Sequence, residues 1–86
     1  MDIGVEISLY PLRADFTPAI GDFLARLGTH AGLRVETNSM STQLFGSYET
    51  VMEAVRRELR VTFETAAERA DKAVFVMKVM GPLPPA

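Results

Sequence analysis

The segment Ile3-Gly-Val-Glu-Ile-Ser-Leu-Tyr10 alternates apolar side chains with glycine or polar side chains from its first residue to its last. A period of two predicts a β-strand with one buried face, because successive side chains of a strand point to opposite sides. The apolar set that should face the core is Ile3, Val5, Ile7 and Leu9. Pro11 is expected to end the strand, since proline has no N–H to donate to a neighbouring strand.

Two helices are expected further along the chain. The first begins with Thr17 as N-cap and Pro18 as first helical residue, and Gly32 is its expected stop. Its apolar stripe is Phe16, Ile20, Phe23, Leu24, Leu27 and Ala31. The second is capped by Ser47, with Glu49 complementing the positive end of its dipole. Its inward stripe is Val51, Val55, Leu59, Thr62, Phe63, Ala66 and Ala70.

Three more strands are expected, at residues 33–38, 40–45 and 73–80. The first of these should lie at a sheet edge, because its outward side is charged. The facing of residues 40–45 is open, since a slip of one residue exchanges its two sides. The last strand should pack Ala73, Phe75, Met77 and Val79 under the helices. Residues 82–86 are interpreted as a proline-rich tail outside a single domain of residues 1–81.

The order strand, helix, strand, strand, helix, strand predicts an α+β fold. Short connections and right-handed crossovers turn this order into the ferredoxin-like βαββαβ plait, a four-stranded antiparallel sheet with both helices on one face. The last strand is then an edge beside the first. Its outward side is also apolar, at Val74, Val76 and Met80. We therefore expect a second subunit to cover this face or extend the edge, giving a homo-dimer or tetramer.

Composition excludes several classes of function. The 86 residues suit one domain, and a net charge of −2, from 9 basic and 11 acidic residues, gives no basis for binding nucleic acid or an anionic membrane. The absence of cysteine excludes a disulfide framework, a thiolate metal site and a cysteine nucleophile. No apolar run approaches the roughly 20 residues that span a bilayer, and a cytoplasmic location is expected.

No catalytic residue, metal or cofactor is expected, because no set of side chains forms a catalytic constellation. His30 lies near the end of the first predicted helix, where a cation favours the helix dipole. Arg13 follows the first strand without the glycine-rich loop of a phosphate site. The arginines of the second helix should form a solvated face, with Glu53–Arg57 and Arg60–Glu64 pairs.

The stretch Asn38–Tyr48 concentrates amides and hydroxyls around Leu44 and Phe45. Small polar groups beside apolar side chains suit a neutral or weakly cationic ring compound, not a metal or phosphate. The alternative is a Ser/Thr-rich strand whose hydroxyls simply face water. The open face of the first strand adds Glu6, Ser8 and Tyr10. We therefore expect a ligand pocket here, at or near the subunit contact.

Three segments in this order resemble the YkoF-type family of thiamine and hydroxymethylpyrimidine binding proteins. They are Val5-Glu-Ile-Ser-Leu-Tyr-Pro-Leu12, Val35-Glu-Thr37 and Met40-Ser-Thr-Gln-Leu-Phe-Gly46, the last leading into a long helix. The resemblance implies a ferredoxin-like domain that occurs either as two copies in one chain or as single-domain chains that associate into dimers and tetramers. It also implies binding of the pyrimidine part of thiamine without catalysis. By position it implies a set of ligand contacts at Ser8, Tyr10, Asn38, Ser41, Thr42 and Gln43.

The chemistry of an aminopyrimidine is compatible with these residues. Its amino group and ring nitrogens match amide and hydroxyl partners such as Asn38, Thr42 and Gln43. Phe45 or Tyr10 should line the ring plane. Glu6 is either an acceptor for a protonated ring or an acid that faces solvent or the interface. Two other functions stay open, a cofactor-independent oxygenase of dimeric ferredoxin-like type and a ligand-sensing oligomerisation module.

Overall fold

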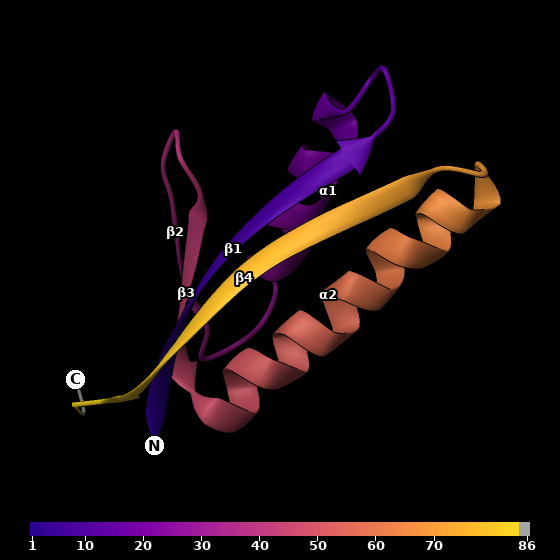
Figure 1. Ribbon diagram of the computed structural model, residues 1–86. Coiled ribbons are helices and arrows are strands. Elements are labelled where there is room, and N and C mark those ends of the chain that lie inside the picture. Colours follow the sequence, from indigo (N-terminus) through magenta and orange to yellow (C-terminus); the bar gives the residue numbers. More distant parts are fainter. Residues whose placement is uncertain (85–86) are drawn as a thin grey trace.

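The computed structural model describes residues 1–84 and arranges them as a four-stranded antiparallel sheet with two helices on one face (Figure 1). The strand order is β2-β3-β1-β4. The elements are β1 (Asp2–Leu12), α1 (Thr17–Leu27), β2 (Arg34–Thr37), β3 (Thr42–Ser47), α2 (Tyr48–Glu68) and β4 (Lys72–Leu83). The predicted ferredoxin-like plait is confirmed, with β1 and β3 central and β2 and β4 at the edges.

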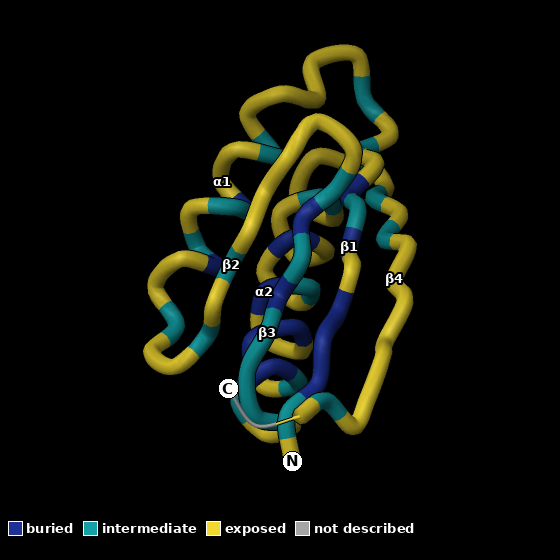
Figure 2. The backbone as a smooth tube through the Cα atoms, turned by 90° about the vertical axis from the view of Figure 1, so that its left-hand side faces the viewer, coloured by how far each residue is buried: buried dark blue, intermediate teal, exposed yellow. Residues whose placement is uncertain are grey.

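The core lies between the sheet and the two helices. The apolar set of β1 is buried as its alternation predicted, at Ile3, Val5, Ile7 and Leu9. Figure 2 shows the same division, with buried stretches on the two central strands and exposed stretches along β2 and β4. Phe75 of β4 closes the core between the helices, 5.1 Å from the ring of Phe23 and 5.5 Å from that of Phe63. This aromatic set joins β4 to α1 and α2.

Both ends of α1 differ from the prediction. Phe16 occupies the N-cap without a side-chain hydrogen bond, so Thr17 is the first helical residue and not the cap. The helix ends at Leu27 with Gly28 as C-cap. Gly32 lies in the following turn with φ of 79°, a conformation that glycine adopts at little cost.

The start of α2 was predicted correctly, because Ser47 Oγ accepts the backbone N–H of Thr50 at 3.2 Å. Its inward face differs in detail. Ala54 and Glu58 are buried there, whereas Phe63 is half exposed. The helix ends at Glu68, and Ala70, predicted to lie in it, has φ of 55°. On the outer face Glu53 pairs with Arg56 and not with Arg57, and the predicted Arg60–Glu64 pair is present at 3.7 Å.

The strand boundaries differ from the prediction, most clearly in β1, β3 and β4. β1 continues through Pro11 to Leu12, and this is tolerated because β1 pairs with β4 alone beyond Ile7. β3 begins at Thr42 and includes Gly46 and Ser47. β4 continues to Leu83, which pairs with Asp2, so the proline-rich segment does not begin outside the sheet at residue 82. Residues 85–86 of the expected tail lie outside the described residues.

The facing of two strands is now settled. Thr42 and Leu44 are buried toward the helices, so Gln43 and Phe45 lie on the open face of the sheet. On β4, Ala73 and Phe75 pack under the helices, but Met77 and Val79 remain exposed. Within residues 1–84 neither helix is long and apolar enough to cross a membrane.

Candidate functional site

The central strand β1 extends beyond its pairing with β3 but stays paired with β4. β3 pairs with β1 only as far as the Ile7–Thr42 pair, whereas β4 pairs with it to Leu12. Residues 8–10 of β1 therefore have no strand on the β3 side. The backbone N–H and C=O groups along that edge have no strand partner among residues 1–84. A ligand that excludes water from this edge can supply their hydrogen bonds, which buried backbone groups require.

A cavity of about 210 Å³ lies beside this unpaired edge of β1. The β2–β3 turn and α1 enclose it from two sides, and β1 forms the third. The polar residues on its wall include Ser8, Tyr10, Asn38, Ser41 and Thr42. Ile20, Phe23 and Leu24 of α1 provide an apolar wall. Five of the eight predicted contact residues thus share one concave surface with apolar side chains, an arrangement typical of sites for small organic ligands.

Asn38 shapes the turn that borders the cavity. Its Oδ1 accepts the backbone N–H groups of Met40 at 2.8 Å and Ser41 at 3.1 Å, and its own N–H donates to the Ser41 carbonyl at 3.0 Å. Both lone pairs of the amide oxygen are therefore used. Only the amide NH₂ of Asn38 can serve a ligand, and it serves as a donor.

Thr42 lies deeper, on the helix side of β3. Its hydroxyl shares a 3.1 Å hydrogen bond with that of Thr37 on β2, and the residue is buried. Since a hydroxyl has one proton and two lone pairs, the Thr37–Thr42 pair keeps an acceptor site for a ligand group.

Glu6 and Gln43 lie outside the cavity, on the open face of the sheet. Ser41 Oγ donates to Glu6 Oε2 at 3.1 Å, and Gln43 Nε2 donates to Ser41 Oγ at 2.8 Å. Lys78 Nζ of β4 is 3.9 Å from Glu6 Oε1. Ser41 therefore belongs to both surfaces, and it links the cavity to a polar cluster on the open face.

Phe45 is not brought to the cavity. It lies across from Gly4 on β1, where a side chain would come within 3.1 Å of the Phe45 ring. The guanidinium of Arg34 stacks over this ring, with its central carbon 4.1 Å from the ring centroid. The Phe45 ring thus covers β1 at Gly4, which has no side chain. This is the far end of β3 from the cavity, and Phe45 lines a separate hollow of about 240 Å³ there. Of the two aromatic residues expected to line the plane of a ligand ring, Tyr10 lines the cavity beside β1 and Phe45 does not.

Sequence reasoning missed part of the cavity wall. Ile20, Phe23 and Leu24 were assigned to the core stripe of the first helix, and helical periodicity does not distinguish a core position from a pocket wall. Met40, which is 86% exposed at the tip of the β2–β3 turn, also lines the cavity. A large apolar residue in a tight polar turn was the available signal.

The buried carboxylate of Glu58 on α2 forms hydrogen bonds to Arg26 of α1 and to His30, which follows α1. Glu58 Oε1 accepts Nε of Arg26 at 2.8 Å, and its Oε2 is 2.5 Å from Nε2 of His30. Burial raises the pKa of Glu58, but the hydrogen bonds to His30 and Arg26 outweigh it and hold the pKa below its ordinary value. His30 therefore pairs with Glu58 and does more than complement a helix end. Within residues 1–84 no three His, Asp or Glu side chains gather as metal ligands.

The comparisons with known proteins agree with this fold. Residues 2–79 match the YKOF-related family. A Thermotoga maritima protein described as a candidate for thiamine biosynthesis or salvage superposes with a TM-score of 0.80 at 18% identity, over 95% of this chain and 85% of that one. A hypothetical protein from Methanocaldococcus jannascii gives 0.79 at 21% identity, over 99% and 84%. A Streptococcus pneumoniae protein gives 0.83 at 18% identity, over 96% and 89%. No curated protein matches the chain.

Proposed function

This chain belongs to the YKOF-related family, and from that premise we propose that it binds thiamine, through the hydroxymethylpyrimidine part, in the cavity beside β1. The proposal rests on one observation. Ser8, Tyr10, Asn38, Ser41 and Thr42, which are distant in sequence or divided between strand and turn, line the same cavity as an apolar wall of α1. The description of the Thermotoga maritima protein supports the same class of ligand.

The size of the cavity favours one ring over a whole vitamin. Pockets for drug-sized ligands measure about 300–1,000 Å³, and this cavity measures about 210 Å³. An aminopyrimidine is flat, with apolar faces and polar edges. Its faces match Leu24 and Phe23, and its edge matches the hydroxyls and the free backbone edge of residues 8–10. The remainder of thiamine would extend outward, past Met40.

The cationic part of thiamine has a partner near the mouth of the cavity. Ser41 lines the cavity and donates to Glu6, whose carboxylate is exposed on the open face. A cation leaving the cavity at Ser41 therefore meets the negative charge of Glu6, which the nearby Lys78 only partly offsets at 3.9 Å. We propose no catalysis, and the role of the protein is then carriage, salvage or storage in the cytoplasm.

A second copy of the chain is proposed to cover the open face. Large side chains are exposed there on β1 and β4, namely Tyr10, Leu12, Val74, Val76 and Met80. β4 is also a long edge strand, with unpaired backbone groups on its outer side. Glu6 of β1 and Lys78 of β4 lie side by side on this face, so a two-fold contact can bring each near the opposite charge of the other copy.

Calorimetry with thiamine and with hydroxymethylpyrimidine tests the ligand assignment. Both compounds should bind with a stoichiometry of one per chain. Thr42→Val removes only a hydroxyl, and Asn38→Asp keeps the oxygen that holds the turn while removing the NH₂ donor. Each should weaken binding by about tenfold, corresponding to one hydrogen bond of about 1.4 kcal/mol.

Gln43→Ala is the matched control, because Gln43 follows Thr42 on β3 but lies outside the cavity. The affinity of this variant for both compounds should stay close to that of the unchanged protein. Absence of heat with both compounds at millimolar concentration would refute the proposal. Equal binding by all three variants would place the ligand elsewhere on the chain.

A further inference from the structure

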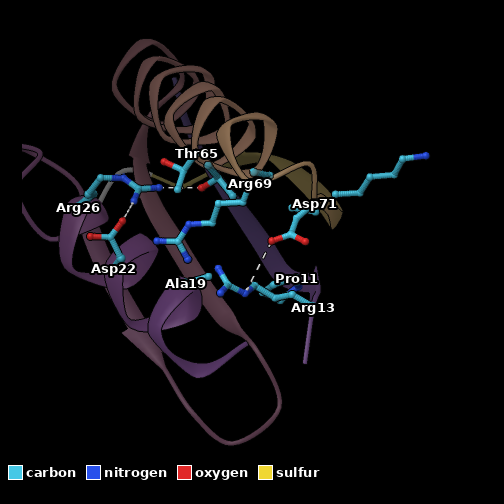
Figure 3. Close-up of a pocket in the computed structure, with 12 residues that line it drawn as sticks. Pro11, Arg13, Ala19, Asp22, Arg26, Thr65, Arg69 and Asp71 are labelled. Atoms are coloured by element: carbon cyan, nitrogen blue, oxygen red, sulfur yellow. Dashed lines mark hydrogen bonds and ion pairs between the residues drawn. The ribbon is translucent and has the colours of Figure 1, made fainter. Parts of the chain in front are cut away.

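A second cavity lies on the other side of α1, between α1, the end of α2 and the two loops beside them (Figure 3). Its volume is about 50 Å³, which holds about three to five water molecules at ~10–15 Å³ each. It is too small for a ring compound. The oxygens of a phosphate, sulfate or carboxylate group, in contrast, fit a space of this size.

The charged side chains on its wall are mostly basic. Arg13, Arg26, Arg69 and Lys72 line it together with Asp22 and Asp71. Arg26 is already neutralised by its ion pairs with Asp22 and Glu58. Lys72 pairs with Leu12 on the open face of the sheet, so its charge lies away from the cavity. The guanidinium groups of Arg13 and Arg69 therefore face one remaining carboxylate, that of Asp71.

Two of these guanidinium groups are available to a ligand. Arg13 Nε lies 3.8 Å from Asp71 Oδ2, which is an ion pair without a hydrogen bond. Within residues 1–84 no ion pair involves Arg69. In Figure 3 the guanidinium groups of Arg13 and Arg69 both point toward Ala19 of α1. A planar guanidinium offers two parallel N–H donors, which match two oxygens of an oxyanion.

Backbone hydrogen bonds hold the segment that carries Arg69 at the end of α2. Asp71 N donates to the Ala66 carbonyl at 2.9 Å, and Ala70 N donates to the Ala67 carbonyl at 3.2 Å. This pair of bonds is the Schellman ending of a helix. The two helix ends have opposing effects on the electrostatic potential in the cavity, since the start of α1 is partially positive and the end of α2 is partially negative. The sign of that potential therefore depends on the arginine side chains.

We propose that this cavity binds a small oxyanion, a phosphate or a carboxylate, between the guanidinium groups of Arg13 and Arg69. The ligand class follows from the volume and the charge. The site is separate from the cavity beside β1, because the two share no residue and are lined by different faces of α1. Its occupation does not depend on the proposed binding of thiamine.

Titration of the ¹⁵N-labelled protein with inorganic phosphate, and separately with acetate, tests the proposal. Ionic strength is held constant with sodium chloride, because screening alone shifts exposed charges. The Nε–Hε signals of Arg13 and Arg69 should move together and saturate with one or both anions. Arg13→Gln and Arg69→Gln should each raise the Kd about tenfold, corresponding to the loss of one charged hydrogen-bond partner.

Arg57→Gln is the control, because it removes the same charge from an exposed arginine outside the cavity. Its Kd should equal that of the unchanged protein. Arg69→Lys keeps the charge but loses the forked geometry, so an intermediate Kd supports two-point recognition. Chemical shifts of the Arg13 and Arg69 signals that rise linearly with both anions would refute the proposal. A loss of affinity in Arg57→Gln equal to that in Arg13→Gln and Arg69→Gln would refute it too.

Discussion

Glu58 of α2 and Arg26 of α1 form an ion pair in the space between the two helices, with 2.8 Å between Oε1 and Nε. The Glu58 side chain is only 8% exposed. Arg26 also donates to Thr62 Oγ1 at 2.7 Å, so the guanidinium links one helix to two successive turns of the other. The pair thereby holds α1 in place, and α1 forms the apolar wall of the proposed thiamine cavity.

Replacing Glu58 should lower the free energy of unfolding. Glu58→Ala removes the partner of Arg26 and His30, and we expect a loss of about 1–3 kcal/mol. A larger loss is not expected, because Arg26 keeps Asp22 and Thr62. Urea denaturation measures the change. Glu53→Ala, which removes an exposed acid on the same helix, should change stability by less than about 0.5 kcal/mol, and equal effects at the two positions would contradict the role given to Glu58.

The same carboxylate predicts a pH dependence. The pKa of Glu58 is lower in the folded protein than its ordinary value of 4.5, because hydrogen bonds to His30 and Arg26 outweigh the effect of burial. Its contribution is therefore complete above about pH 4.5 and declines as the pH falls through the lower folded value. The difference in stability between the unchanged protein and Glu58→Gln should shrink between pH 7 and pH 3 in thermal melts. A difference that grows toward acid pH would mean that the sign is wrong.

Ala70 offers a way to stabilise the chain. Its φ of 55° lies in the left-handed region, and it occupies the position after the α2 C-cap where glycine is common. Ala70→Gly should raise the free energy of unfolding by about 0.5–1 kcal/mol, because relief of strain exceeds the extra entropy of the unfolded chain. Ala70→Val should lower it instead. Differential scanning calorimetry distinguishes the two, and a Tm that falls with glycine would refute this assignment of strain.

The order and type of the elements were predictable because the determining patterns are local. Ile3 to Leu9 alternate, and Ser47 offers a side-chain oxygen ahead of a helical stripe, so both elements follow from short-range rules. Strand ends were less predictable. Pro11 remains in β1 only because β3 has already stopped pairing, and no local pattern contains that information.

The polar residues of the cavity were largely predictable from the sequence, although Glu6 and Gln43 lie outside it, and the apolar wall was not predicted. Ser8, Asn38 and Thr42 meet because the plait places the end of β1 beside the β2–β3 turn. Phe45 lies outside this cavity, and the guanidinium of Arg34 on the neighbouring strand stacks on its ring, a contact that no local sequence pattern indicates. Glu58 was missed because a charged residue on a helix usually faces water, and its burial depends on two residues about 30 positions away.

The proposed contact between two copies makes the last prediction. Val76 of β4 lies opposite Ser8 on the open face and is 53% exposed. In a two-fold interface one substitution appears twice, so Val76→Lys would bury two like charges. The assembly should then weaken by about a hundredfold or more, corresponding to about 2.7 kcal/mol. Sedimentation velocity measures this, with Ala25→Lys on the exposed face of α1 as the control for added charge. A 9.5 kDa monomer for the unchanged protein, or an assembly that Val76→Lys leaves intact, would show that this face is not the contact.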